Sequence, residues 1–120
     1  MNWEYIAGFF DGEGYCKKQG RYTVIQITQQ HKEVLEEIQQ FLGYGHIYRK
    51  DNKLKYKGFD LRIFKRKDCI DFITKIKPFS IVKKEELNKI ENSIINDMRE
   101  RIQKTLGKNF DLKYIKERLE

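Results

Sequence analysis

The chain has 120 residues, and its 25 Lys and Arg residues outnumber its 18 Asp and Glu residues, which gives a net charge of +7 at pH 7. This length allows one compact domain and argues against a second, while the positive charge is typical of proteins that bind nucleic acid. No apolar stretch approaches the ~18 residues that would span a membrane, and the N-terminus has no basic start of the kind that opens a secretory signal.

The periodicity of the apolar residues predicts an α+β chain in which helices alternate with pairs of strands. The predicted elements are a helix over 3–12, strands over 15–19 and 21–30, a helix over 34–42, strands over 45–50 and 53–65, and a helix over 70–76. Asn2 is the expected N-cap of the first helix, Gly20 marks the first hairpin, and Asp51-Asn52 marks the second. The order of these elements is therefore αββαββα.

A long helix is predicted after Pro78, from about 83 to 106, with Gly107 at its end. A short final helix follows, capped by Asp111, with Phe110 and Ile115 placed as a hydrophobic staple. We expect a single domain over residues 1–120, with a core of about 1–97 and a C-terminal helical extension of about 98–120. Neither a linker nor an internal repeat interrupts it.

The cysteine pattern gives no sign of a disulfide or a zinc site. Cys16 and Cys69 lie far apart, without C-x-x-C spacing or paired histidines beside them. We therefore expect two reduced thiols in an intracellular protein, cytoplasmic or organellar, that is not secreted.

The most informative stretch is residues 6–14, which read Ile-Ala-Gly-Phe-Phe-Asp-Gly-Glu-Gly. Glycines inside a helix cost roughly 0.5–1 kcal/mol each relative to Ala, so Gly8 and Gly12 indicate that another backbone approaches this face closely. Asp11 and Glu13 lie at the helix C-terminus, where acidic side chains oppose the macrodipole. They are poor choices for stability and hence candidates for chemistry, although a helix that ends in a Gly-rich turn with solvated carboxylates would give the same pattern.

This stretch resembles the signature of the LAGLIDADG homing endonucleases, residue by residue from Ile6 to Gly14. The resemblance implies the homing-endonuclease-like fold, in which a curved antiparallel sheet and flanking helices follow the order αββαββα. It also implies a site-specific endonuclease that makes a staggered break in both strands of a long, near-palindromic double-stranded DNA target, and that spreads an intron or intein. The implied cofactor is Mg²⁺, for which Mn²⁺ substitutes; we expect no organic cofactor and no membrane partner.

The motif occurs once in the chain. In the family, two motif helices pack together and their carboxylate ends build the active site, so a chain with one motif is expected to form a twofold homodimer. Ala7, Gly8 and Gly12 would lie at the helix crossing. The two copies of Glu13 would then come close together.

The resemblance also implies roles for individual residues. Glu13 matches the metal-binding acid, which is usually Asp in the family, and Gly12 is placed with it at the metal; Asp11 matches the other acid, which more often has a structural role. Gln29 falls where the family often has a polar residue that orients water or metal. Lys83 resembles the active-site lysine that stabilises the phosphate or polarises water, and Lys84 is its nearest rival.

Strand alternation identifies the side chains that would face DNA. On the fourth strand Phe59, Leu61 and Ile63 point to one face, while the polar residues point to the other. Hydrogen-bonding groups on such a face can read base edges, and lysines can contact phosphates. The predicted DNA-binding residues are Tyr15, Lys17, Gln19, Tyr22, Gln26, Thr28, Tyr48, Lys50, Asp60 and Arg62. An ordinary solvated sheet face is the alternative.

Other sites and functions are weaker alternatives. His31 is expected to cap or precede the second helix and His46 to lie at a strand edge, rather than to act as a general base. Residues 51–53 read Asp-Asn-Lys, a fragment of a D-x-K metal site, but they fall at a predicted hairpin tip. The alternative functions are an RNA maturase, a DNA-binding protein of the same fold that does not cut, and a basic RNA-binding protein outside the family.

Overall fold

The computed structural model describes residues 1–51 and 57–106. Its elements are α1 (Trp3–Glu13), β1 (Gly14–Gln19), β2 (Tyr22–Gln29), α2 (Lys32–Leu42), β3 (His46–Asp51), β4 (Lys57–Ile63), α3 (Arg66–Ile76) and α4 (Lys84–Leu106). The predicted αββαββα order is confirmed, and the predicted long helix follows it as α4. The tip of the second hairpin and the short helix predicted at Asp111 lie outside the described residues.

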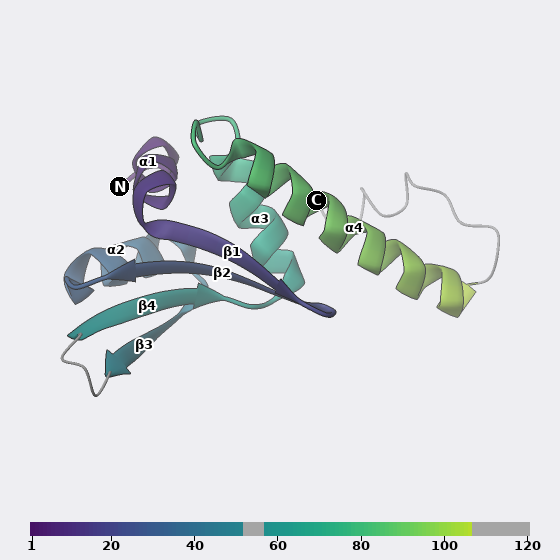
Figure 1. Ribbon diagram of the computed structural model, residues 1–120, viewed down its shortest axis with the longest axis horizontal. Coiled ribbons are helices and arrows are strands. Elements are labelled where there is room, and N and C mark those ends of the chain that lie inside the picture. The colour runs from purple at the N-terminus through teal and green to yellow at the C-terminus, as the bar shows by residue number, and fades with distance from the viewer. Residues whose placement is uncertain (52–56, 107–120) are drawn as a thin grey trace.

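The strands form one antiparallel sheet in the order β1-β2-β4-β3 (Figure 1). One row of paired residues crosses the whole sheet and consists of Tyr15, Gln26, Arg62 and His46. The next row on three of the strands consists of Thr28, Asp60 and Tyr48. Because side chains alternate along a strand, the two rows lie on the same face of the sheet.

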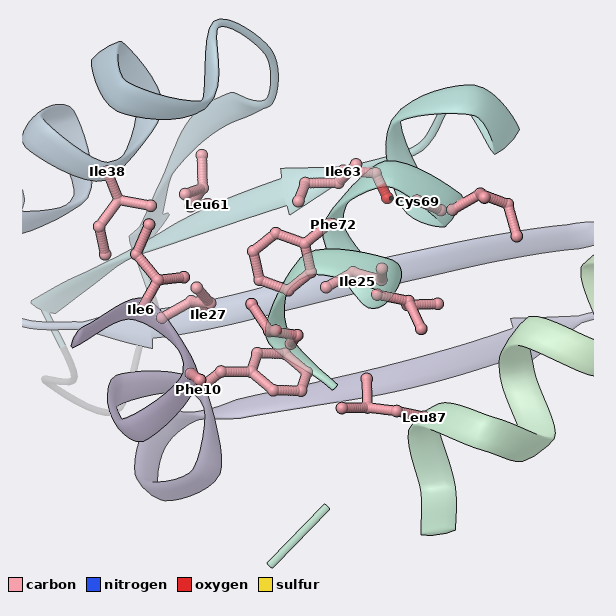
Figure 2. Packing of buried hydrophobic residues seen from close by; sticks show 14 of the residues in the cluster. Ile6, Phe10, Ile25, Ile27, Ile38, Leu61, Ile63, Cys69, Phe72 and Leu87 are labelled. Carbon is pink, nitrogen blue, oxygen red and sulfur yellow. Dashed lines mark hydrogen bonds between the residues drawn. The ribbon is translucent and has the colours of Figure 1, made fainter. Parts of the chain in front are cut away.

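The opposite face of the sheet packs against helices α1, α2 and α3 and contains the core. Ile25, Leu61 and Ile63 are buried here, as the alternation of the strands predicts. Phe10 of α1 and Phe72 of α3 meet above the sheet in an edge-to-face pair with ring centroids 5.5 Å apart (Figure 2). Full burial of one such side chain contributes about 1.5–3 kcal/mol, so this layer fixes the position of α1.

Helix α4 runs alongside α3 and the edge strand β1 (Figure 1). Leu87 belongs to the core, and Lys18 of β1 forms an ion pair with Asp97 at 3.2 Å and a hydrogen bond with Ser93. Since Lys18 points toward α4, its neighbour Lys17 points toward the face that the helices leave open.

The boundaries of α1 are set by two residues at its ends. At the start, Oδ1 of Asn2 accepts a hydrogen bond from the N–H of Tyr5 at 2.7 Å, which confirms the predicted N-cap. At the end, Gly14 turns the chain directly into β1. A Cβ at Gly14 would lie 2.1 Å from the buried ring of Phe10, so only glycine fits here without a shift of the core.

Candidate functional site

The carboxylate of Asp11, in the last turn of α1, is bound by the segment between α3 and α4. Its oxygens accept a hydrogen bond from the Ser80 hydroxyl at 2.5 Å and hydrogen bonds from the backbone N–H groups of residues 81–83 at 2.8–3.4 Å. Because α4 begins at Lys84, the N–H groups that Asp11 satisfies belong to the loop residues immediately before this helix.

The hydrogen bonds of Asp11 also set its ionisation. Partial burial raises the pKa of Asp11, but the bonds from the N–H of Ile81 and from Ser80 lower it by more, so the pKa lies below the ordinary value of 3.8. The carboxylate is therefore anionic at neutral pH and serves as a fixed acceptor. This surrounding matches the structural role that the motif implies for Asp11.

Lys83 binds the same C-terminal end of α1 through its side chain. Its Nζ donates hydrogen bonds to the carbonyl oxygen of Phe10 at 2.9 Å and to that of Gly14, and lies 5.3 Å from the centre of the Phe10 ring. The carbonyl oxygen of Phe10 also accepts the N–H of Gly14, and the helix dipole favours a cation at this end of α1. The ammonium group of Lys83 is thus fixed at the helix end that bears the two acids.

Glu13 has the opposite surroundings to Asp11. It is the last residue of α1, its side chain is exposed, and it forms no hydrogen bond or ion pair with any described residue. Within the described ranges, no three His, Cys, Asp or Glu side chains are grouped closely enough to hold a metal ion. Mg²⁺, however, is often bound by one or two carboxylates together with waters and phosphates. Glu13, with the carbonyl of Gly12 beside it in the last turn, fits that donor set.

The side chain of Gln29 binds the backbone just before α2. Its Oε1 accepts hydrogen bonds from the backbone N–H of Gln30 at 2.8 Å and of His31 at 3.5 Å. On β2, Gln29 shares the strand parity of the buried Ile27 rather than that of Thr28. His31 is the N-cap residue of α2, as expected, but its side chain makes no capping hydrogen bond.

The exposed face of α1 has empty space beside its two glycines, Gly8 and Gly12. Tyr5 and Phe9 stack on it with ring centroids 6.0 Å apart, and a Cβ built at Gly8 or Gly12 would meet no atom within 4 Å. Ala7 does not belong to this face: it is 0% exposed and packs in the core of the chain, which corrects its predicted place at a helix crossing. The close backbone approach that the two glycines indicate is not supplied by any described residue.

The open face of the sheet carries the predicted DNA-binding residues. Tyr15, Tyr22 and Tyr48 are exposed, and so is Lys17. The side chains of Gln19 and Lys50 lie outside the described residues. Gln26 and Asp60 have the predicted parity but are 4% and 1% exposed, because their polar groups are packed within the two rows of this face.

One residue of these sites was missed by sequence reasoning, and one lies where it was expected. His46, expected at a strand edge, is exposed on the edge strand β3 and ends the row that begins at Tyr15. Ser80 is buried and donates to Asp11. Nothing in the sequence connects Ser80 with Asp11, because the two lie 69 positions apart.

Comparison with known families agrees with the geometry of α1 and the sheet. The family model described as the LAGLIDADG-like domain matches residues 2–77, which include both strand pairs and the first three helices. No curated protein gives a significant match to the chain.

Solved structures of homing endonucleases share the fold. The chain is 14% identical to I-CvuI in complex with the I-CreI target, covering 98% of this chain and 93% of that chain at a TM-score of 0.64. It is 20% identical to I-TnaI, covering 100% and 99% at a TM-score of 0.64. It is 25% identical to the archaeal intron-encoded enzyme I-Vdi141I complexed with DNA, covering 94% and 91% at a TM-score of 0.55.

Proposed function

The chain belongs to the family of LAGLIDADG-like domains, and on this premise we propose that it is a site-specific endonuclease that cuts both strands of DNA as a Mg²⁺-dependent homodimer. The observation that carries the proposal is the unpartnered carboxylate of Glu13 at the end of a helix whose exposed face is open at Gly8 and Gly12. Both features are unexplained in one protomer. Both are explained if a second α1 and a metal-bound phosphate occupy this end of the molecule.

Glu13 is the proposed metal ligand, with the carbonyl oxygen of Gly12 as the second protein donor. A bound Mg²⁺ would activate water and stabilise the charge that develops on the departing oxygen, and Mn²⁺ would substitute for it. Asp11 holds the neighbouring loop in place through its hydrogen bonds. The two carboxylates of the motif therefore divide structure and chemistry between them.

Lys83 and Gln29 are the proposed supporting residues of the reaction. The ammonium of Lys83 is fixed beside the end of α1, where its charge favours an approaching phosphate and polarises nearby water. Gln29 lies at the end of β2, and its amide nitrogen, which makes no hydrogen bond with a described residue, remains able to orient water. Each group must hold its position when DNA binds.

The proposed dimer interface extends from the exposed face of α1 to the loop before α4. Tyr5 and Phe9 are apolar rings beside the open glycines. Ile81 and Val82 are 87% and 74% exposed, although the backbone of both is fixed by Asp11. Apolar side chains held in a rigid exposed loop are typical of a surface that a partner covers. A second copy would place its own glycine face here.

The open sheet face is the proposed DNA-binding surface, with Tyr15 and Lys17 exposed on it and Arg62 half-buried between them and β3. A DNA substrate and the free thiols of Cys16 and Cys69 fit a protein that works inside the cell. Among the described residues, no helix is both long and apolar enough to cross a membrane.

Cleavage is tested on DNA that joins the two sequences flanking the protein's own coding element, as if that element were absent. We expect a staggered break in both strands that requires Mg²⁺ or Mn²⁺ and stops on addition of a chelator. Cleavage that persists in chelator would contradict the metal assignment. Binding without cleavage in either metal would contradict the endonuclease itself.

The dimer is tested by sedimentation of the wild type, Gly8→Leu and Gly12→Leu. A leucine at either position meets no atom of its own protomer near the Cβ, so its effect falls on the partner, at a cost of roughly 1–3 kcal/mol or more. Glu36→Leu on the exposed side of α2 is the matched control and should leave the dimer intact. A monomeric wild type at micromolar concentration would contradict the proposed interface.

A further inference from the structure

An acidic side chain lies buried in the centre of the open sheet face. Asp60 is on β4, flanked by Thr28 on β2 and Tyr48 on β3, and it is 1% exposed. A carboxylate is costly to bury unless its oxygens are hydrogen-bonded and its charge is paired. An acid is also a poor contact for a DNA phosphate. Its presence here requires a different explanation.

Both oxygens of Asp60 have a donor. The hydroxyl of Thr28 donates to Oδ1 at 2.7 Å, and Nη2 of Arg62 donates to Oδ2 at 3.0 Å. The amide nitrogen of Gln26 in turn donates to the hydroxyl of Thr28 at 3.2 Å. The carboxylate is therefore held in one orientation by donors on two strands: Thr28 of β2 binds Oδ1, and Arg62 of β4 binds Oδ2.

The guanidinium of Arg62 is held from two directions but keeps free donors. Its central carbon lies 4.9 Å from the centre of the Tyr48 ring, and its side chain is 36% exposed. Nε is buried without a hydrogen-bond partner and is not available to DNA, whereas Nη1 bonds to no described residue. The restrained guanidinium thus keeps N–H groups on its terminal nitrogens for an acceptor that comes from outside.

We propose that Asp60 is a positioning residue that fixes Arg62 for recognition of a guanine edge in the major groove. An arginine that donates to O6 and N7 of guanine must present two N–H groups in one plane, and the ion pair and the Tyr48 ring restrict that plane before binding. The side-chain entropy of Arg62 is thus already reduced in the free protein. This inference rests on the proposed function, and it gives Asp60 an indirect role in place of a direct DNA contact.

The competing explanation is an ion pair that only ties β2 to β4. In that case, loss of Asp60 would weaken folding and would reduce affinity for all DNA sequences by the same factor. A positioning role instead changes which base is preferred at one position of each half-site. The two explanations therefore predict different sequence profiles of binding: a uniform loss of affinity in the first case, and a loss of discrimination at one base pair in the second.

The experiment selects bound sequences from a randomised duplex library with the wild type, Arg62→Lys, Asp60→Asn and Thr28→Val. Wild-type protein should select a guanine that Arg62→Lys no longer prefers, with discrimination lowered roughly 5- to 150-fold. Asp60→Asn should lower discrimination at the same base pair severalfold while binding to random DNA stays equal or rises, because a negative charge is removed. Thr28→Val keeps that charge and should show a smaller loss at the same position.

Two controls separate the possible outcomes. Lys17→Ala, on the same face, should weaken binding to every sequence uniformly. In the Arg62→Lys background, Asp60→Asn should cause no further loss of discrimination. If Asp60→Asn does not fold in a thermal melt, Thr28→Val with Arg62→Lys forms the same cycle. A guanine preference untouched by the Asp60 and Thr28 variants overturns this inference alone, whereas a wild type that selects no sequence overturns the proposed function.

Discussion

Asp11 and Glu13 lie in the same last turn of α1, yet their carboxylates have opposite surroundings. Asp11 accepts hydrogen bonds from Ser80 and from three backbone N–H groups, and its pKa is lowered by them against the effect of burial. Glu13 is exposed and bonds to no described residue. A motif that looks symmetric in the sequence is thus divided into a residue that stabilises the fold and a residue that is free to bind a ligand.

The two glycines inside α1 differ in the same way from the glycine that follows it. Gly14 is required by the fold of the chain itself, because a Cβ there would overlap the ring of Phe10. Gly8 and Gly12 have open space around them. Intolerance of substitution at Gly8 or Gly12 would therefore report on a partner and not on the fold.

The largest effect on folding is expected from Asp11→Ala. Removal of the carboxylate leaves the N–H groups before α4 without their acceptor, and hydrogen bonds to a charged group contribute about 1.5–3 kcal/mol. We expect a loss of about 3 kcal/mol in the free energy of unfolding, measured by urea denaturation. Glu13→Ala is the matched control and should change it by less than about 0.5 kcal/mol. Equal losses of unfolding free energy in the two variants would contradict the proposed structural role of Asp11 alone.

Gly14→Ala is expected to destabilise the chain by about 1–3 kcal/mol, since Phe10 must move within a packed core. Gly8→Ala and Gly12→Ala should instead stabilise the unassembled chain by about 0.5–1 kcal/mol, because alanine favours the helix. Denaturation under conditions in which the protein is monomeric checks the sign. A destabilisation at Gly8 equal to that at Gly14 would show that both glycines serve the fold.

Lys83→Met is expected to cost about 0.5–1 kcal/mol of stability, because the last carbonyls of α1 lose their cation. It should also slow cleavage strongly while metal binding survives. Lys84→Met is the control, since Lys84 is the rival candidate and is exposed. If Lys84→Met slows cleavage and Lys83→Met does not, the active-site lysine is Lys84 and not Lys83.

The smallest expected effect is the acid dependence of folding. The folded pKa of Asp11 is lowered, so its contribution is complete above the unfolded pKa near 3.8 and is lost as the pH falls through the lower folded value. Asp11→Asn should flatten the stability curve in that window. Ser80→Ala removes one donor and should move the loss of stability to slightly higher pH. Denaturation midpoints measured below pH 4 test both variants.

The sequence predicted the elements and the faces of the strands, because these depend on local periodicity. The buried face of Leu61 and Ile63 followed from alternation alone. Ala7 was misplaced because the small size of a helical residue does not tell whether its own core or a partner covers it. Helical phase decides this, and Ile6 and Phe10 share the buried side with Ala7.

The contacts that define the candidate site were beyond the sequence for a physical reason. Asp11 meets Ser80 and Lys83 meets Phe10 across 69 and 73 positions, and such pairs form only when the core sets α1 against the loop before α4. The burial of Asp60 is similar, since parity placed it on the open face but could not show that Thr28 and Arg62 would enclose it.

The most direct measurement compares cleavage by Glu13→Gln and Asp11→Asn homodimers on the same target with Mg²⁺, alongside DNA affinity and the free energy of unfolding. Glu13→Gln keeps the size of the side chain and removes only the charge, so we expect full stability, retained DNA binding and no cleavage. Asp11→Asn should be less stable but should still cut at a temperature where it is folded. Cleavage by Glu13→Gln at the wild-type rate would contradict the division of roles between the two carboxylates.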